Sequence, residues 1–129
     1  MISNETLRQN LDPVGLIKDD VLLEALRESS LIQTKEDAAN LTLDTLAKQL
    51  STGQTQLLAL TQALITAKTS ESARLLLLDE PTSQIDEGSQ RQVLDALLAA
   101  NKAKNGSSIM IAHKLESAVR YSDRIIVMD

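Results

Sequence analysis

Three short apolar runs separated by helical segments constrain the fold of this chain more than any other feature. The runs are Leu75 to Leu78, Ile109 to Ala112 and Ile125 to Met128. Runs this short, without alternating polar positions, are typical of strands buried on both faces of a parallel sheet. Apolar residues recur at helical spacing from Gln90 to Leu98, and Leu115 to Arg120 is predicted to form a short helix. We therefore predict an α/β fold in the second half, with parallel strands joined by crossover helices.

A helical segment is predicted to precede these strands. Carboxylates at Asp19 and Asp20 begin an apolar stretch and Arg27 lies near its end, an order of charges that suits the helix dipole. A pair of serines, starting at Ser29, ends it. Apolar residues at helical spacing predict a second helix from Gln54 to Lys68. We expect Leu31 to Leu50 to be mostly loop, and Asn105 with its following glycine to end the helix of the second half.

The composition excludes several classes of function. The 129 residues carry 18 acidic and 13 basic side chains, a net charge of −5, which argues against binding to nucleic acid. The absence of cysteine excludes disulfides and thiolate metal sites. The longest apolar run, Ala96 to Ala100, is far shorter than the roughly 20 residues that cross a bilayer, and no secretory signal is visible. We expect a soluble chain that does not enter a membrane by itself.

Polar clusters follow two of the apolar runs. Asp79 and Glu80 follow the first run, and His113 follows the second. Ligands of open parallel sheets bind beyond the carboxyl ends of the strands. There, one carboxylate can hold a divalent cation through water, a second can polarise an attacking water, and a histidine can hydrogen-bond a phosphoryl group. Each also has a plainer explanation, because Asp79 and Glu80 precede Pro81 and suit a capping turn, and a lone histidine is commonly structural.

A third cluster, Ser51 to Gln54, precedes the predicted helix of the middle segment. A hydroxyl and a glycine at this place leave backbone N–H groups and the positive end of the helix dipole available to an anion. The alternative is an ordinary N-cap serine followed by a flexible glycine.

Taken together, these clusters resemble the motifs of ABC-type ATPases. Leu50 to Leu60 resembles the signature motif, usually Leu-Ser-Gly-Gly-Gln, and Leu75 to Ser83 resembles the Walker B strand with its catalytic glutamate. Ser83 to Asp86 looks like the D-loop, and Ile111 to Leu115 looks like the switch-histidine motif. The motifs follow one another in the family's order and spacing.

The resemblance extends over nearly the whole chain. Asn10 to Pro13 and Ser122 to Asp129 are similar to the second nucleotide-binding domain of multidrug-resistance-associated (subfamily C) transporters. The resemblance implies a partial P-loop NTPase (ABC ATPase) fold, in which parallel strands with crossover helices follow a helical subdomain segment. Residues 1–68 would form the helical subdomain and signature helix, with Asp12 to Leu31 facing the membrane-spanning part. Residues 69–129 would form the Walker B to switch-His part of the catalytic core.

The resemblance also implies ATP and Mg²⁺ as cofactors. Asp79 would bind Mg²⁺ through water, Glu80 would polarise the hydrolytic water, and His113 would contact the γ-phosphate. The partners would be a second nucleotide-binding domain in a head-to-tail dimer and the membrane-spanning domains of a transporter, at the cytoplasmic face of a membrane.

Across that dimer, three residues would touch the γ-phosphate of an ATP held by the opposite domain: Ser51, Gly53 and Gln54. Asp86 would belong to the loop that couples the two sites.

The chain departs from the family's pattern at a few positions. Thr52 replaces the first glycine of the signature, and Thr61-Gln62 stands where the family usually has Ala-Arg. None of the four glycines is followed by lysine, so the phosphate-binding Walker A loop is absent from these 129 residues. We expect that loop, the Gln loop and the adenine-stacking aromatic to lie before residue 1.

These observations predict one ATP-binding and hydrolysis half-site of an ABC transporter, in a fragment that is inactive alone. The alternative is a non-catalytic interaction module that docks on a complete nucleotide-binding domain. A soluble ABC ATPase of the DNA-repair or chromosome-maintenance type shares these motifs, but the chain lacks long heptad segments and its Asn10 to Pro13 stretch favours the transporter.

Overall fold

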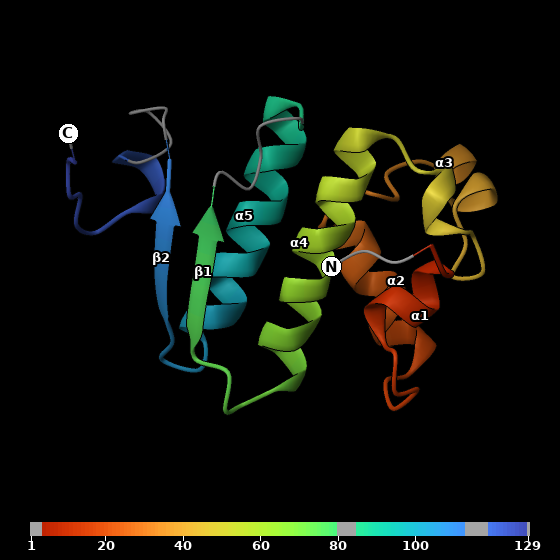
Figure 1. Ribbon diagram of the computed structural model, residues 1–129, viewed down its shortest axis with the longest axis horizontal. Helices are drawn as coiled ribbons and strands as arrows, with labels where there is room; N and C mark the ends of the chain where they lie inside the picture. Colours follow the sequence, from red (N-terminus) through yellow and green to blue (C-terminus); the bar gives the residue numbers. More distant parts are fainter. Residues whose placement is uncertain (1–3, 80–84, 113–118, 129) are drawn as a thin grey trace.

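The computed structural model of the chain describes residues 4–79, 85–112 and 119–128 (Figure 1). Within these ranges the elements follow in the order α1 (Leu7–Leu11), α2 (Asp19–Glu28), α3 (Lys35–Asn40), the 3-10 helix η1 (Ala47–Gln49), α4 (Thr52–Thr69), β1 (Leu75–Asp79), α5 (Glu87–Lys102) and β2 (Ser107–Ile111).

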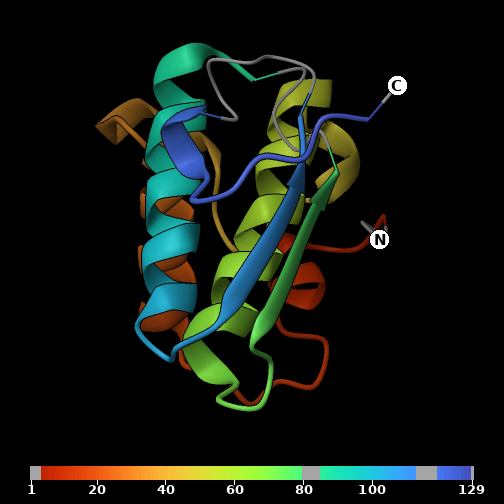
Figure 2. The same ribbon diagram turned by 90° about the vertical axis from the view of Figure 1, so that its left-hand side faces the viewer.

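The two strands form a parallel sheet with α5 as their connection. Leu75 lies opposite Ser107 and Asp79 lies opposite Ile111, so both strands end at the same edge. Helices α4 and α5 lie behind one face of this sheet, and α1 and α2 pack on the far side of α4 (Figures 1 and 2). The order of layers is therefore sheet, then α4 with α5, then the short helices of the first half.

Helix α4 is the centre of the core. It is apolar on several faces because it is covered both by α5 and by the first-half helices, as expected for a helix between two layers. Leu58 and Leu64 of α4 and Leu97 of α5 are fully buried, and the cluster around them is aliphatic. Leu22 and Leu26 of α2 complete it from the other side, also with no exposed surface.

Three of the helices predicted from sequence are confirmed as α2, α4 and α5. Helix α2 ends where Ser29 forms its C-cap, and α4 begins two residues before the predicted start. Helix α5 ends in a left-handed turn at Asn105, whose φ is 57°, and the next N–H donates to Asn101 O at 2.9 Å. That next residue is Gly106, where a Cβ would lie 2.7 Å from Arg74 O, so only glycine fits between the helix end and β1.

The segment from residue 31 to residue 50 is mostly loop, as predicted, but it contains two short helices, α3 and η1, that the apolar pattern did not indicate. Helix α3 is short and polar, so it has no apolar period to detect. Thr34 and Asp37 instead form a capping box: each side chain accepts from the other residue's backbone N–H, both at 3.0 Å.

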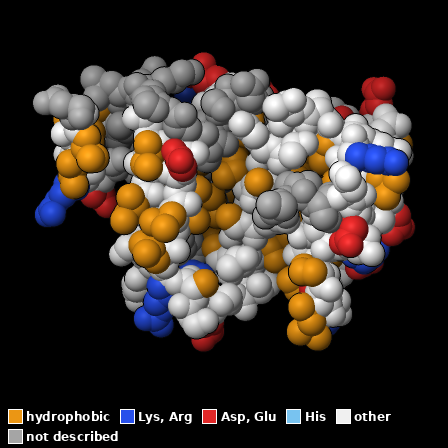
Figure 3. Space-filling model, in the orientation of Figure 1, with side chains coloured by type: hydrophobic (Ala, Val, Ile, Leu, Met, Phe, Trp, Pro, Cys, Tyr) orange, Lys and Arg blue, Asp and Glu red, His pale blue; other side chains and the backbone are white. Residues whose placement is uncertain are grey.

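The prediction that the strands are buried on both faces is wrong. Leu78 is buried against the helices, but side chains that point the other way are largely exposed: Leu75 by 60%, Leu77 by 66%, Ile109 by 58% and Ile111 by 55%. The helices cover only one face, and successive side chains of a strand point to opposite faces. Figure 3 shows apolar side chains on the molecular surface over the strands.

The prediction of a third strand at 125–128 is also wrong. These residues are not in a strand, and the sheet of the described residues consists of β1 and β2. Apolar content indicates that a segment avoids water, but a strand also needs a neighbour with which to exchange hydrogen bonds. Ile126 is 79% exposed and Val127 is 83% exposed, so the described residues do not cover these two apolar side chains.

The predicted short helix at 115–120 lies partly outside the described residues. Residues 119–121 are helical, and nothing further is described for 113–118. No described helix combines the length and the apolar character needed to span a bilayer.

Candidate functional site

One end of the molecule gathers four element ends. The N-termini of α4 and α5 and the carboxyl ends of β1 and β2 all lie at the top of Figure 1, and the rotated view agrees (Figure 2). This end carries three of the segments singled out from sequence: Ser51 to Gln54, Asp79 and Asp86. Helix N-termini at the carboxyl edge of a parallel sheet are a common setting for anionic ligands.

Asp79 is the last residue of β1 and is exposed to solvent. The strand register places it opposite Ile111, two positions before His113. Glu80 and His113 themselves lie outside the described residues, so their predicted roles stay predictions. The pairing nevertheless brings the two strand ends that carry them to one edge, as the parallel pattern predicted.

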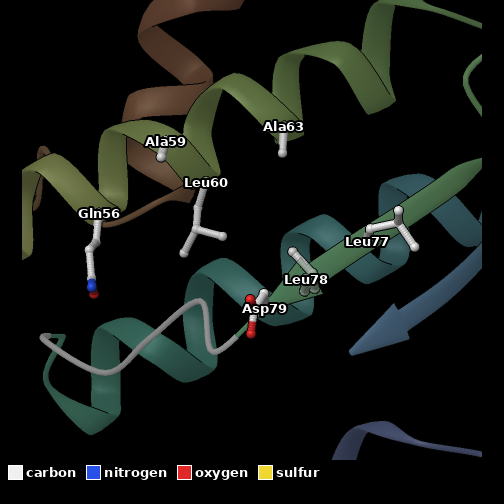
Figure 4. Close-up of a pocket in the computed structure, with 7 residues that line it drawn as sticks. All are labelled: Gln56, Ala59, Leu60, Ala63, Leu77, Leu78 and Asp79. Atoms are coloured by element: carbon white, nitrogen blue, oxygen red, sulfur yellow. The ribbon is translucent and has the colours of Figure 1, made fainter. Parts of the chain in front are cut away.

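A cavity of about 320 Å³ opens beside Asp79, between α4 and β1. Figure 4 shows its lining residues: Gln56, Ala59, Leu60 and Ala63 from α4, and Leu77, Leu78 and Asp79 from β1. The lining is mainly apolar, and Gln56 and Asp79 are its polar members. The sequence analysis gave Gln56 no role of its own, although the residue lies within Leu50 to Leu60, the segment that resembles the signature motif.

Ser51 and Gln54 form a reciprocal cap at the start of α4. The Ser51 hydroxyl accepts from Gln54 N at 3.2 Å, and Gln54 Oε1 accepts from Ser51 N at 2.9 Å. Gly53 lies in the first turn of the same helix. The plainer explanation of this segment, an N-cap, is therefore realised. Because these two side chains are already engaged with backbone, any contact that they make to a ligand competes with the cap or shares its atoms.

Asp86 is the N-cap of α5. Its Oδ2 accepts from Ser89 N at 3.0 Å. The backbone N–H of Ser89, and after it the Ser89 hydroxyl, lower the pKa of Asp86 below its ordinary value of 3.8, against a smaller opposing effect of desolvation. The carboxylate therefore remains ionised at neutral pH, with a fixed direction at the start of the helix.

The residues at this end are compatible with a water-mediated divalent cation. The Asp79 carboxylate is exposed and takes part in none of the salt bridges found among the described residues. Among these residues no group of three or more potential ligands could hold a metal ion directly. A single carboxylate suits a hard cation that keeps most of its water, as Mg²⁺ does.

The two departures at 61 and 62 have structural partners. Thr61 is fully buried in α4, and its Oγ1 lies 2.6 Å from Leu57 O and 2.7 Å from Ser29 Oγ of α2. Gln62 Nε2 donates to Asn10 O of α1 at 2.8 Å. Both side chains thus join α4 to the first-half helices.

Comparison with solved structures identifies the fold. An ABC transporter ATP-binding protein from Pyrococcus furiosus superimposes with a TM-score of 0.67 at 21% identity, over 89% of this chain and 54% of that one. The chain therefore has part of the fold of an ABC ATPase, a P-loop NTPase with parallel strands, as the sequence predicted.

Comparison with curated sequences finds similarity to ABC transporters. ABC-type transporter cicA of Emericella nidulans is 35% identical over 142 residues, which span 96% of this chain and 10% of the relative. ATP-binding cassette sub-family C member 10 of Mus musculus is also 35% identical, over 95% of this chain and 8% of the relative. No family model matches the chain. The chain is similar to ABC transporters over nearly its whole length, and it spans about a tenth of the length of these relatives.

Proposed function

We propose that this chain supplies one ATP-binding and hydrolysis half-site of an ABC transporter, and that the complete protein uses it to drive transport across a membrane. The observation that carries the proposal is the meeting of Ser51 to Gln54, Asp79 and Asp86 at one end of the molecule. The match to ABC transporters over nearly the whole chain supports it. ATP and Mg²⁺ are the cofactors of this proposal.

In this proposal each residue has one task. Asp79 holds the waters of Mg²⁺, Glu80 polarises the attacking water, and His113 hydrogen-bonds the terminal phosphate. The metal, when bound, neutralises charge on the phosphate oxygens. Glu80 and His113 take these roles from the resemblance alone, whereas Asp79 is also supported by its exposed position at the end of β1.

The remaining site residues act on a partner domain. We propose that Ser51, Gly53 and Gln54 approach a nucleotide held by a second nucleotide-binding domain, where the N-terminus of α4 supplies N–H groups and a favourable dipole. Asp86 lies in the segment that links the two sites. Residues 1–68 act as the helical subdomain and signature helix, residues 69–129 as part of the catalytic core, and membrane-spanning domains at the cytoplasmic face as further partners.

The same proposal expects the 129 residues to be inactive alone, because they contain no Gly-Lys-Ser or Gly-Lys-Thr loop to cradle phosphates. The test is steady-state phosphate release by the purified chain with Mg-ATP. We expect no release above that of a Glu80→Gln variant. Turnover by the wild-type chain that Glu80→Gln abolishes would contradict the expected inactivity.

A second candidate is a non-catalytic module that docks on a complete nucleotide-binding domain. The exposed apolar face of the sheet favours it, because contiguous apolar surface is typical of a protein contact.

Mixing the chain with a complete ABC nucleotide-binding domain separates the two candidates. A half-site makes the ATPase rate of the mixture sensitive to Ser51→Arg in the chain, because Ser51 approaches the nucleotide held by the complete domain. A docking module makes ATP-dependent binding sensitive to Ser51→Arg, but the ATPase rate of the mixture is the same with the wild-type chain, Ser51→Arg and Glu80→Gln. Thr66→Arg, an exposed position at the other end of α4, is the matched control and leaves both readouts unchanged. A mixture unaffected by either of the first two variants would overturn both candidates.

A further inference from the structure

A chain of hydrogen bonds leads from the turn after α2 to the Asp86 carboxylate. Gln33 Nε2 donates to Ser89 Oγ at 3.2 Å and to Ser30 O at 3.1 Å. Ser89 in turn donates its backbone N–H and its hydroxyl to the Asp86 side chain. Gln33 and Ser89 are 56 positions apart in sequence, so this contact exists only because the tertiary structure brings α5 against the turn.

Ser89 is suited to link Gln33 to the Asp86 carboxylate. The residue is 4% exposed, so water does not readily replace either of its partners. A hydroxyl has one proton and accepts at its oxygen. Because Gln33 donates to that oxygen, the proton of Ser89 is left to point at Asp86.

Gln33 is held in place by its own backbone. The N–H groups of Gln33 and Thr34 both donate to Asp37 Oδ2, at 3.1 Å and 3.0 Å. The carbonyl of Ser30, whose φ of 69° marks a tight left-handed turn, fixes the amide of Gln33 from the other side. The side chain therefore reaches Ser89 from a preorganised turn.

We propose that Gln33 and Ser89 are positioning residues, which orient the Asp86 carboxylate and connect the turn at residues 30–34 to the start of α5. The functional meaning of this connection rests on the proposed function, in which Asp86 belongs to the loop that couples two ATP sites. A displacement of the turn relative to α5 then changes the direction of Asp86 without any contact to nucleotide.

A second tether across the same interface provides a control. Gln92 Nε2 of α5 donates to Arg27 O of α2 at 2.9 Å, one turn further along the helix, in a hydrogen bond that does not involve Ser89. The nearest charged side chains on α5, Glu87 and Arg91, pair with each other at 3.9 Å and are present in all variants. An effect on Asp86 that appears in Gln33→Ala and not in Gln92→Ala therefore reports the proposed connection rather than general loosening.

The experiment measures the pKa of Asp86 by carboxyl NMR titration and the exchange of the residue-89 amide hydrogen in the 129-residue chain. Gln33→Ala is expected to raise the pKa of Asp86 toward its ordinary value and to speed amide exchange about fivefold, the factor for a typical net hydrogen bond. Ser89→Ala raises the pKa further, and Ser89→Thr, which keeps the hydroxyl, restores it. Gln33→Ala added to Ser89→Ala has no additional effect.

Two results would overturn the proposal. One is an unchanged pKa and exchange rate in Gln33→Ala; the other is an equal change in Gln92→Ala. If Ser89→Ala does not fold, the comparison of Gln33→Ala with Gln92→Ala still tests the proposal. Both of these side chains are exposed, so neither substitution is expected to prevent folding. No nucleotide is used, so failure here is distinct from failure of the proposed ATP half-site.

Discussion

At the scale of single residues, polar groups inside the aliphatic core determine how α4 meets its neighbours. Thr61 stands where the family usually has alanine, and its hydroxyl is satisfied by Leu57 O and Ser29 Oγ. A buried hydroxyl with partners stabilises, and its removal takes one hydrogen bond away from the buried interface. The departure from the family is therefore built into the packing of this chain.

We predict that Thr61→Val lowers the free energy of unfolding by about 1 kcal/mol, because shape is kept and the buried hydrogen bond is lost. Urea denaturation followed by circular dichroism measures it. Thr66→Val on the same helix removes an exposed hydroxyl that bonds only to Gln62 O, and it should change stability by less than about 0.5 kcal/mol. Equal effects of the two substitutions would contradict the role given to Thr61.

The Asp12 carboxylate makes the stability of the folded chain depend on pH. Its carboxylate accepts from Ile17 N at 2.8 Å, from Gly15 N at 3.0 Å and from Leu16 N at 3.2 Å, which closes the loop between α1 and α2. The backbone hydrogen bond from Ile17 is the largest cause that lowers the pKa of Asp12 below its ordinary value of 3.8. A carboxyl whose folded pKa is lowered stabilises the protein above its unfolded pKa.

We predict that Asp12→Asn destabilises the chain at pH 7, since an amide has one acceptor oxygen where the carboxylate uses two. The stability that Asp12 confers is lost as the pH falls from about 3.8 through the lowered folded pKa. Urea midpoints of wild type and variant should thus converge in acid. A difference that stays constant from pH 7 to pH 3 would show that the charge of Asp12 is not the cause.

At the scale of elements, the three long helices were predictable, whereas the short helices and the environments of the strands were not. The apolar period of α2, α4 and α5 is a local property, so their sequences indicate both their existence and most of their ends. The apolar runs at β1 and at 125–128 look alike in sequence, yet only the first is a strand. Strand formation depends on a partner that is distant in sequence, and periodicity carries no information about it.

We predict that Ser51→Ala destabilises the chain by about 1 kcal/mol through loss of the α4 cap. Thr52→Ala, at the first helical position, should be neutral or slightly stabilising because its side chain makes no cap bond. Chemical denaturation of the two variants separates the structural role of Ser51 from its proposed role toward nucleotide. If Ser51→Ala is as stable as wild type, the reciprocal cap with Gln54 contributes nothing in solution.

At the scale of the whole molecule, one face of the sheet is covered and the other is open. Leu77 and Ile109 are paired in register on the open face, and both are more than half exposed. Leu78, next to Leu77 in the same strand, is buried beneath the helices at 6% exposure. Neighbouring leucines in one strand therefore contribute very differently to stability and to association.

We predict that the pair of substitutions Leu77→Thr and Ile109→Thr reduces the binding of a hydrophobic dye and the self-association of the chain, with little change in the urea midpoint. The single substitution Leu78→Thr is the matched control and should cost about 3 kcal/mol, because it removes a buried side chain and buries a hydroxyl. Light scattering and denaturation provide the two readouts. A cost for Leu77→Thr equal to that for Leu78→Thr would mean that the open face is covered in solution.

The amino-acid sequence by itself determined the α/β class, the order of α2, α4, β1, α5 and β2, and the motifs that relate the chain to ABC ATPases. Local periodicity and motif spacing suffice for these, since each depends on residues close in sequence. Only the tertiary structure decided that two apolar runs pair, that one face of their sheet stays open, and that Ser51, Asp79 and Asp86 share one end. The tertiary structure also decided that the Gln33 side chain donates a hydrogen bond to Ser89. These features depend on which distant segments pack together, and that choice is made by burial of the common core around α4.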